Sequence, residues 1–248
     1  MLLHGFTDTW RTWELVLPEL ESEHDVLALT LPGHAGGPPL GSEVSDHLMV
    51  DALERAMDDA GFATAHLAGN SLGGYLALHR AARGRARSVV AFAPAGGWAA
   101  GDDSYRELLG LQASMHAQAV RGAALAAAAM GTREARRRAT RLITVNYDHI
   151  PADLLAHQIL GVARCDAGPL IAYALAEGYR VDAERITCRV RIVWGGDDQL
   201  LPWPSAAVRY RADWLPNADW FVIDGVGHCP QLDVPLEAAE LILGFTAG

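Results

Sequence analysis

Short, almost entirely apolar runs alternate with stretches of helical periodicity along most of the chain. Strands of a parallel sheet are covered on both faces, so they read as continuous apolar runs. The alternation therefore predicts an α/β fold, a mostly parallel twisted sheet of about six strands flanked by helices. The expected strands are 1–3, 25–31, 65–69, 88–93, 190–194 and 220–224, and the expected helices are 10–20, 44–60, 72–83, 205–214 and 235–245.

Residues 96–180 interrupt this alternation, because they contain no convincing strand. Connections in compact domains are usually about 4–6 residues long, so this segment needs structure of its own. It is rich in Ala, Leu and Arg. We expect one core domain, formed by 1–95 and 181–248, with 96–180 inserted as a helical lid. The helices expected in the lid are 104–119, 122–130, 133–145 and 152–163.

The charge and cysteine content exclude several classes of partner. The formal net charge is −10, which argues against a nucleic-acid surface. Cys165, Cys188 and Cys229 are odd in number and lack metal-ligand spacing, so we expect free thiols and no metal. No apolar run reaches membrane-spanning length, and no secretory signal precedes the first motif. We expect a soluble cytoplasmic protein that does not bind membranes.

The pentapeptide Gly-Asn-Ser-Leu-Gly at 69–73 lies where an apolar strand gives way to a helix. This G-x-S-x-G pattern is typical of a nucleophile elbow, a strained turn that lifts a serine hydroxyl above the sheet. The alternative is a serine that caps a helix, and the strand before it argues against that. We therefore expect Ser71 to be a nucleophile.

A serine hydroxyl needs an adjacent base, and that base needs an acid to orient it. Of the ten histidines, only His228 lies just beyond the last expected strand, in a glycine-containing loop. Asp197 and Asp198 follow the preceding strand, and the residues alone leave both open as the acid. The order serine, acid, histidine agrees with the one found in parallel-sheet hydrolases that carry this elbow.

An oxyanion formed at the serine needs hydrogen-bond donors. The backbone N–H groups of Leu72, at the start of a helix, and of Phe6, in the turn after the first strand, are the candidates. One such donor typically lowers the barrier by about 3 kcal/mol. Gly5 lets the turn approach the serine closely.

Together these motifs resemble the α/β-hydrolase superfamily over essentially the whole chain. The matching segments are 2–6 with Trp13, Leu-Pro-Gly-His at 31–34, 69–74, 194–202 and Gly-Val-Gly-His at 225–228. The resemblance places the acid three residues after the glycine that ends its strand, which selects Asp198 over Asp197. The superfamily also contains dehalogenases and epoxide hydrolases, which resemble this chain less because they use aspartate where it has Ser71.

One departure from the family pattern concerns the start of the sheet. Family members usually have two strands before the strand that leads to His-Gly, and this chain starts within that strand. We therefore expect a sheet that is short by two strands, with 25–31 at an exposed edge. Pairing of two copies through that edge would protect it, so a homodimer is an open alternative.

The function expected from these residues is hydrolysis of a carboxylic ester of a small, largely apolar substrate, through an acyl-serine intermediate and without any cofactor. Alternatives within the fold are carbon–carbon bond hydrolysis, for which Asn70 is suggestive, and cofactor-free haloperoxidase or perhydrolase activity. A non-hydrolysing small-ligand receptor is an alternative of another class. The pocket residues expected are Gly5, Asn70, Trp98, Tyr105, Met115 and Tyr147.

Overall fold

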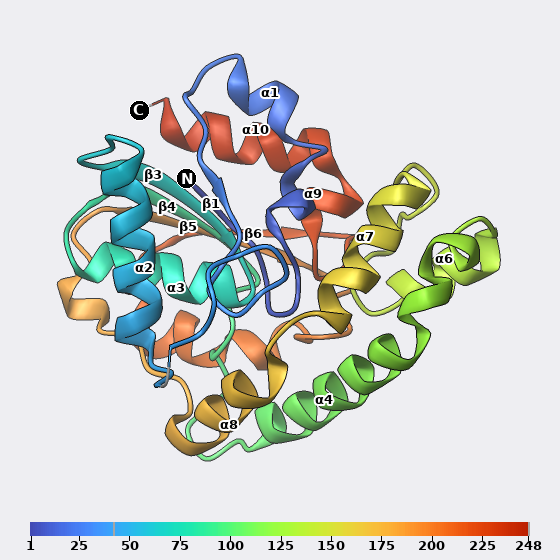
Figure 1. The fold of residues 1–248 in the computed structure, drawn as a ribbon. Coiled ribbons are helices and arrows are strands. Elements are labelled where there is room, and N and C mark those ends of the chain that lie inside the picture. Colours follow the sequence, from blue (N-terminus) through green and yellow to red (C-terminus); the bar gives the residue numbers. More distant parts are fainter. Residues whose placement is uncertain (42, 248) are drawn as a thin grey trace.

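The computed structural model describes residues 1–41 and 43–247, and its centre is one parallel six-stranded sheet (Figure 1). Neighbouring strands follow the order β2-β1-β3-β4-β5-β6. All five pairings are parallel, and β2 forms one edge, as expected for the segment around 25–31. The strands are β1 (Leu2–Leu3), β2 (Ala28–Leu29), β3 (Ala65–Asn70), β4 (Ala86–Phe92), β5 (Arg189–Gly195) and β6 (Asp219–Ile223).

Side chains of the central strands alternate between two hydrophobic cores, one on each face of the sheet. In β4, Val89 and Ala91 belong to one core and Val90 and Phe92 to the other. This alternation follows from the two-residue period of a strand. Both sets are apolar because both faces are covered, which explains the continuous apolar runs in the sequence.

Two layers of helices cover these faces. Residues of α2 (Asp46–Asp59) and α3 (Leu72–Ala82) join the first core, and residues of α1 (Leu17–Glu21) and α10 (Pro235–Thr246) join the second. The expectation of one helix over 10–20 is wrong: a 3-10 helix, Trp10–Trp13, precedes α1, because Pro18 has no N–H to donate to an earlier carbonyl. The expected helix 205–214 is likewise split, into a 3-10 turn, Ser205–Ala207, and a π-helical turn, Tyr210–Trp214.

Between β4 and β5 the chain forms helices that lie together at one side of the sheet (Figure 1, green to orange). Three expectations there need correction. The helix expected over 122–130 is split into a 3-10 helix, Ala123–Leu125, and a short α-helix, Ala126–Ala129. The helix expected over 133–145 ends at Thr140, because Val145 and Asn146 donate their N–H groups to the Asp233 carboxylate instead. The helix α8 was not expected. The helices are α4 (Ser104–Gly122), a 3-10 helix (Ala123–Leu125), α5 (Ala126–Ala129), α6 (Arg133–Thr140), α7 (Ala152–Ala163) and α8 (Ala167–Glu177).

Helix length and composition also bear on membrane insertion. In the described ranges 1–41 and 43–247, no single helix is long and apolar enough to cross a membrane. The helices α7 and α8 are long and apolar enough only when taken together, and they are bent by 67° relative to each other.

Two short elements complete the fold, a 3-10 helix, Ala183–Arg185, and α9, Pro230–Asp233.

Candidate active site

Ser71 lies in a sharp turn between β3 and α3. Its backbone has φ 55° and ψ −116°, a left-handed conformation that costs a non-glycine residue on the order of 1–3 kcal/mol. Gly69 and Gly73 make the turn sterically feasible. A Cβ on Gly69 would lie 2.3 Å from the carbonyl oxygen of Gly73, and one on Gly73 would lie 2.2 Å from that of Leu3. Both glycines of the motif are therefore required by close backbone approach.

His228 and Asp198 form a buried hydrogen-bonded pair. His228 Nδ1 donates to Asp198 Oδ2 at 2.7 Å, so Nε2 is the ring nitrogen that is left for a further partner. His228 Nε2 is buried and has no hydrogen-bond partner among the described residues. The described residues also include no hydrogen bond between Ser71 and His228, although both line one cavity. Such bonds often tighten only when substrate is bound.

The other carboxylate oxygen of Asp198 fixes its orientation. Oδ1 accepts the N–H groups of Leu200, at 2.8 Å, and Leu201, at 2.7 Å. Asp197 is exposed, and its backbone N–H donates to the carbonyl oxygen of Val226. The two adjacent aspartates thus differ completely in surroundings, and Asp198 alone reaches the histidine.

Two backbone N–H groups beside Ser71 are free. Across the described residues, neither Phe6 N–H nor Leu72 N–H has a hydrogen-bond acceptor. The turn that carries Phe6 is fixed by His4, which donates from Nδ1 to the Gly5 carbonyl at 2.7 Å and accepts the Leu31 N–H on Nε2 at 2.9 Å. Burial lowers the pKa of His4 well below its usual value, which keeps the imidazole neutral for both bonds.

Asn70, beside the serine, is engaged in holding the histidine loop. Its Nδ2 donates to the carbonyl oxygens of His228, at 2.9 Å, and Phe92, at 3.2 Å. Its Oδ1 accepts from Cys229 Sγ and from Gln231 Nε2. Asn70 does line the cavity, as expected, but its amide nitrogen is fully occupied by the protein.

Asp233 was not identified from the sequence, yet its carboxylate anchors the histidine loop. It accepts N–H groups from Gly227 at 2.6 Å, Val145 at 2.8 Å and Asn146 at 2.6 Å. A second contact joins the histidine loop to the segment 143–146, which follows α6, because the Cys229 N–H donates to the carbonyl oxygen of Ile143. His228 is therefore held between two backbone segments that are distant in sequence.

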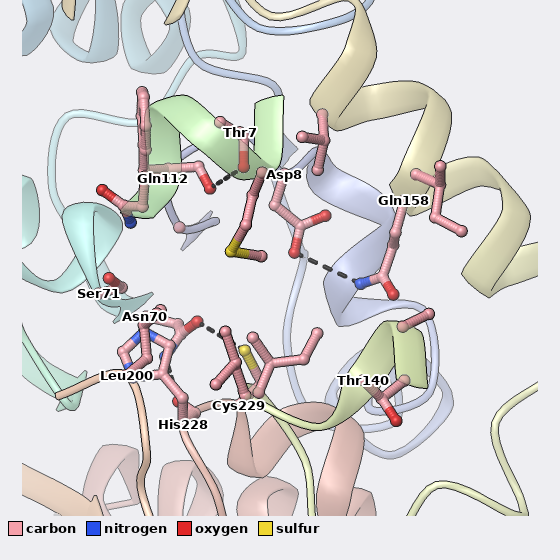
Figure 2. A pocket seen from close by; sticks show the side chains of 18 of the residues that line it. Thr7, Asp8, Asn70, Ser71, Gln112, Thr140, Gln158, Leu200, His228 and Cys229 are labelled. Carbon is pink, nitrogen blue, oxygen red and sulfur yellow. Dashed lines mark hydrogen bonds between the residues drawn. The ribbon is translucent and has the colours of Figure 1, made fainter. Parts of the chain in front are cut away.

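Two cavities meet at Ser71. The first, which we call the His228 cavity, contains His228 and is also lined by residues of α4, α6 and α7, among them Gln112, Thr140 and Gln158 (Figure 2). Met115 of α4 lines it as well. The second, which we call the Tyr75 cavity, contains Tyr75 and is bounded by residues of α2, α4 and α8. Phe6, Ser71 and Gln112 border both.

Three of the residues expected in the pocket do not line either cavity beside Ser71. Trp98 and Tyr105 pack with Tyr179 in the core on the α2 and α3 side, with ring centroids 5.9–6.0 Å apart. Tyr147 packs beside the cluster that contains Ile150 and Leu232. These aromatic side chains stabilise the packing of the inserted segment, while Gly5, Asn70 and Met115 do line the His228 cavity.

No cluster of metal-ligating side chains occurs in the part of the chain that the structure describes. Cys229 borders the His228 cavity beside the histidine, but burial raises the pKa of its thiol well above the usual value. A buried neutral thiol is a poor nucleophile.

Comparison with known proteins identifies the family of the chain. Residues 1–241 match the model of the alpha/beta hydrolase family. The chain is 33% identical to epoxide hydrolase EphH of Mycobacterium tuberculosis, over 82% of the chain and 95% of that protein. It is 28% identical to a pimeloyl-[acyl-carrier protein] methyl ester esterase of Neisseria meningitidis, over 100% of the chain and 76% of that protein.

A solved structure shows the same fold. The crystal structure of a membrane phospholipase A, described as a bacterial virulence factor, superposes with a TM-score of 0.76 at 23% identity. The match covers 100% of this chain and 77% of that one. The chain therefore belongs to the alpha/beta hydrolase family and is an enzyme with hydrolase activity.

Proposed function

We propose that the protein hydrolyses carboxylic esters of small substrates, with Ser71 as nucleophile, His228 as base and Asp198 as the acid that orients it. The observation that carries this proposal is the unpartnered Nε2 of His228 facing the same cavity as Ser71. An unpartnered buried nitrogen is costly, and a nearby hydroxyl or substrate would satisfy it.

In the proposed mechanism, Ser71 Oγ attacks the ester carbonyl while His228 Nε2 takes its proton. The N–H groups of Phe6 and Leu72 hold the oxyanion, aided by the positive end of the α3 dipole. The carbon–oxygen bond to the alcohol then breaks, and His228 returns its proton to that oxygen. A water activated by His228 hydrolyses the acyl-serine and regenerates the enzyme.

We also propose that residues 96–180 act as a lid that determines substrate preference. Met115, Leu155 and Ile159, from α4 and α7, border the His228 cavity opposite the loops of the sheet. The groups assigned to chemistry come from 1–95 and 181–248. In this proposal 1–95 and 181–248 carry out the reaction, and 96–180 selects the substrate.

Epoxide hydrolysis is the second candidate, because the relative from Mycobacterium tuberculosis is named for it. The nucleophile weighs against it. Opening an epoxide with an aspartate forms an ester that water can cleave, whereas opening it with Ser71 would form an alkyl ether. The ether has no carbonyl for water to attack, so turnover would stop after one event.

Carbon–carbon bond hydrolysis is weakened by the contacts of Asn70. Its amide nitrogen donates to the carbonyl oxygens of Phe92 and His228, so it offers no free donor to a diketone substrate. A substrate panel that includes vinylogous diketones alongside esters separates this activity from ester cleavage.

A fluorophosphonate probe tests the proposed nucleophile, followed by mapping of the modified peptide and turnover of p-nitrophenyl butyrate. We expect labelling at Ser71 and loss of both labelling and turnover in Ser71→Ala. Ser114→Ala, an exposed serine of α4, is the matched control and should keep both. Labelling that persists in Ser71→Ala would rule out the assignment. A protein that takes up the probe but turns over no ester would favour the receptor alternative.

A further inference from the structure

The position of His228 distinguishes the two cavities at Ser71, and this inference rests on the proposed ester hydrolysis. His228 borders the His228 cavity and not the Tyr75 cavity. Because the histidine must return its proton to the departing alcohol oxygen, the alcohol has to leave on the histidine side. The alcohol part of the substrate therefore belongs in the His228 cavity, and the acyl part in the Tyr75 cavity.

The His228 cavity is not uniformly apolar, because Asp8 and Gln158 point into it (Figure 2). Asp8 Oδ1 accepts the Thr9 N–H at 2.8 Å, and Asp8 Oδ2 accepts from Gln158 Nε2 at 3.4 Å. These contacts fix the orientation of both side chains. The Thr12 side chain also hydrogen-bonds to the Asp8 carboxylate. A carboxylate can accept about four hydrogen bonds, so Asp8 keeps capacity for a further donor.

Gln158 carries a buried acceptor that the protein does not use. Gln158 is 8% exposed, and its Oε1 has no hydrogen-bond partner among the described residues. A buried acceptor left unsatisfied costs on the order of 1–3 kcal/mol. Its neighbours on the cavity wall, such as Leu155 and Ile159, are apolar and cannot supply a donor.

A purely structural role explains only part of this arrangement. Asp8 Oδ1 helps to order the turn that begins at Thr9, which accounts for one carboxylate oxygen. It does not account for Gln158 Oε1, an acceptor without a partner among the described residues, or for the remaining acceptor capacity of the carboxylate. Burial also raises the pKa of Asp8 to about 6, so keeping this carboxylate ionised in the folded protein costs free energy of desolvation. At pH 8 it is ionised and acts only as an acceptor.

We propose that Asp8 and Gln158 form a subsite for a hydrogen-bond donor on the alcohol part of the substrate. The substrate class that fits is a monoester whose alcohol carries a second polar group with an N–H or O–H, such as a diol or an amino alcohol. The two acceptors select for the donor and against an alkyl chain of the same length, which would leave Gln158 Oε1 unsatisfied.

Hydrolysis of matched butyrate esters at pH 8 tests this subsite. One series carries ω-hydroxyalkyl alcohols of three to six carbons, a second the n-alkyl alcohols of equal length, a third the ω-methoxyalkyl alcohols, and a fourth the ω-dimethylammonioalkyl alcohols. All four form the same butyryl-enzyme, so differences in kcat/KM report the alcohol part alone. A preference for the hydroxyl series would indicate a diol monoester as substrate, and a preference for the ammonium series would indicate an amino-alcohol ester.

We expect the donor-bearing esters to exceed the alkyl and methoxy esters about tenfold in kcat/KM. Asp8→Asn and Gln158→Met should each remove most of that preference, so that kcat/KM for the donor-bearing esters falls toward the value for the alkyl esters measured with the same variant. Asp153→Asn, an exposed acid at the start of α7, is the matched control and should keep the preference. Circular dichroism and thermal melting show whether each variant folds.

The failure outcomes are separable. Equal kcat/KM for all four series, with normal ester hydrolysis, would overturn the subsite and leave the proposed function standing. A preference that appears only when the hydroxyl is moved to the acyl part would overturn the assignment of cavities. If no ester is hydrolysed but calorimetry shows that diols bind Ser71→Ala and not Asp8→Asn, the subsite stands and the proposed function fails.

Discussion

The loops of the sheet and the inserted helices build opposite walls of one cavity, but they are held in different ways. On the sheet side, Ser71 and His228 are positioned by backbone groups, through glycines that allow close approach and N–H groups that bind Asp198 and Asp233. On the inserted side, the wall consists mostly of side chains such as Met115 and Leu155. The first arrangement tolerates little change, whereas the second can change shape one side chain at a time.

The largest effect is expected at the acid. Asp198→Asn removes the acceptor that holds the His228 tautomer, and comparable changes lower turnover by about 10⁴ while the fold stays intact. Asp197→Asn, at the adjacent exposed position, should change kcat far less. Measurement of kcat for both variants decides the assignment. A more damaging Asp197→Asn would mean that the acid is wrongly identified.

Trp98 and Met115 compare packing with cavity shape inside the inserted segment. Trp98→Ala should cost about 3–5 kcal/mol in the free energy of unfolding, because its ring is buried against Tyr105 and Tyr179. Met115→Ala, at the half-buried cavity wall, should cost about 1 kcal/mol. It should instead shift the preference between short and long esters about tenfold. Denaturant unfolding measures the stability of both variants, and a panel of short and long esters measures their substrate preference. Equal effects on stability would contradict the division between packing and cavity wall.

A glycine-to-alanine substitution should have opposite effects on the free energy of unfolding in the two regions. Gly73→Ala places a Cβ 2.2 Å from the carbonyl oxygen of Leu3, so it should destabilise the protein by roughly 3 kcal/mol and displace the serine turn. Gly110→Ala, in the middle of α4, meets nothing within 4 Å and should stabilise by roughly 0.5–1 kcal/mol. Thermal unfolding of both variants checks the contrast. A tolerated Gly73→Ala would show that the sheet side is less rigid than its contacts imply.

The smallest effect concerns Asp8 and depends on pH. Burial raises its pKa from 3.8 to about 6, so the folded state binds the proton more tightly than the unfolded state does. The carboxylate therefore lowers stability above pH 6, and this penalty disappears as the pH falls below about 4. Asp8→Asn should raise the free energy of unfolding by at most about 3 kcal/mol at pH 7.5 and have little effect near pH 4.

Measuring unfolding of both proteins at the two pH values tests this. A destabilised Asp8→Asn at pH 7.5 would indicate that the carboxylate is a structural anchor. A stabilised variant with reduced donor preference would identify a residue retained for substrate recognition at the expense of stability.

The sequence was most informative where backbone geometry dictates residue type. The turn at Ser71 needs glycine on both sides, and the sheet needs apolar runs, so both were evident from the residues alone. Pocket residues were less evident, because an aromatic side chain such as Trp98 looks the same whether it packs or binds. Asp233 was missed because its contacts with Val145 and Gly227 join backbone groups far apart in sequence.

Gln158 left a signal that could have been used. It lies on α7 three or four residues from Leu154, Leu155 and Val162, which places it on an otherwise apolar face of the helix. A lone amide on such a face is either satisfied inside the protein or directed at a ligand. The sequence could raise that question, but only the unpartnered Oε1 in the folded chain favours one answer.

The Asp233 carboxylate also restricts how the active site can open. It binds the Gly227 N–H next to the proposed base and the N–H groups of Val145 and Asn146 beyond α6. A movement that carried 145–146 outward would therefore drag the histidine away from the serine or break two charge-assisted hydrogen bonds. Substrate entry and product release that leave His228 in place must therefore leave 145–146 in place as well.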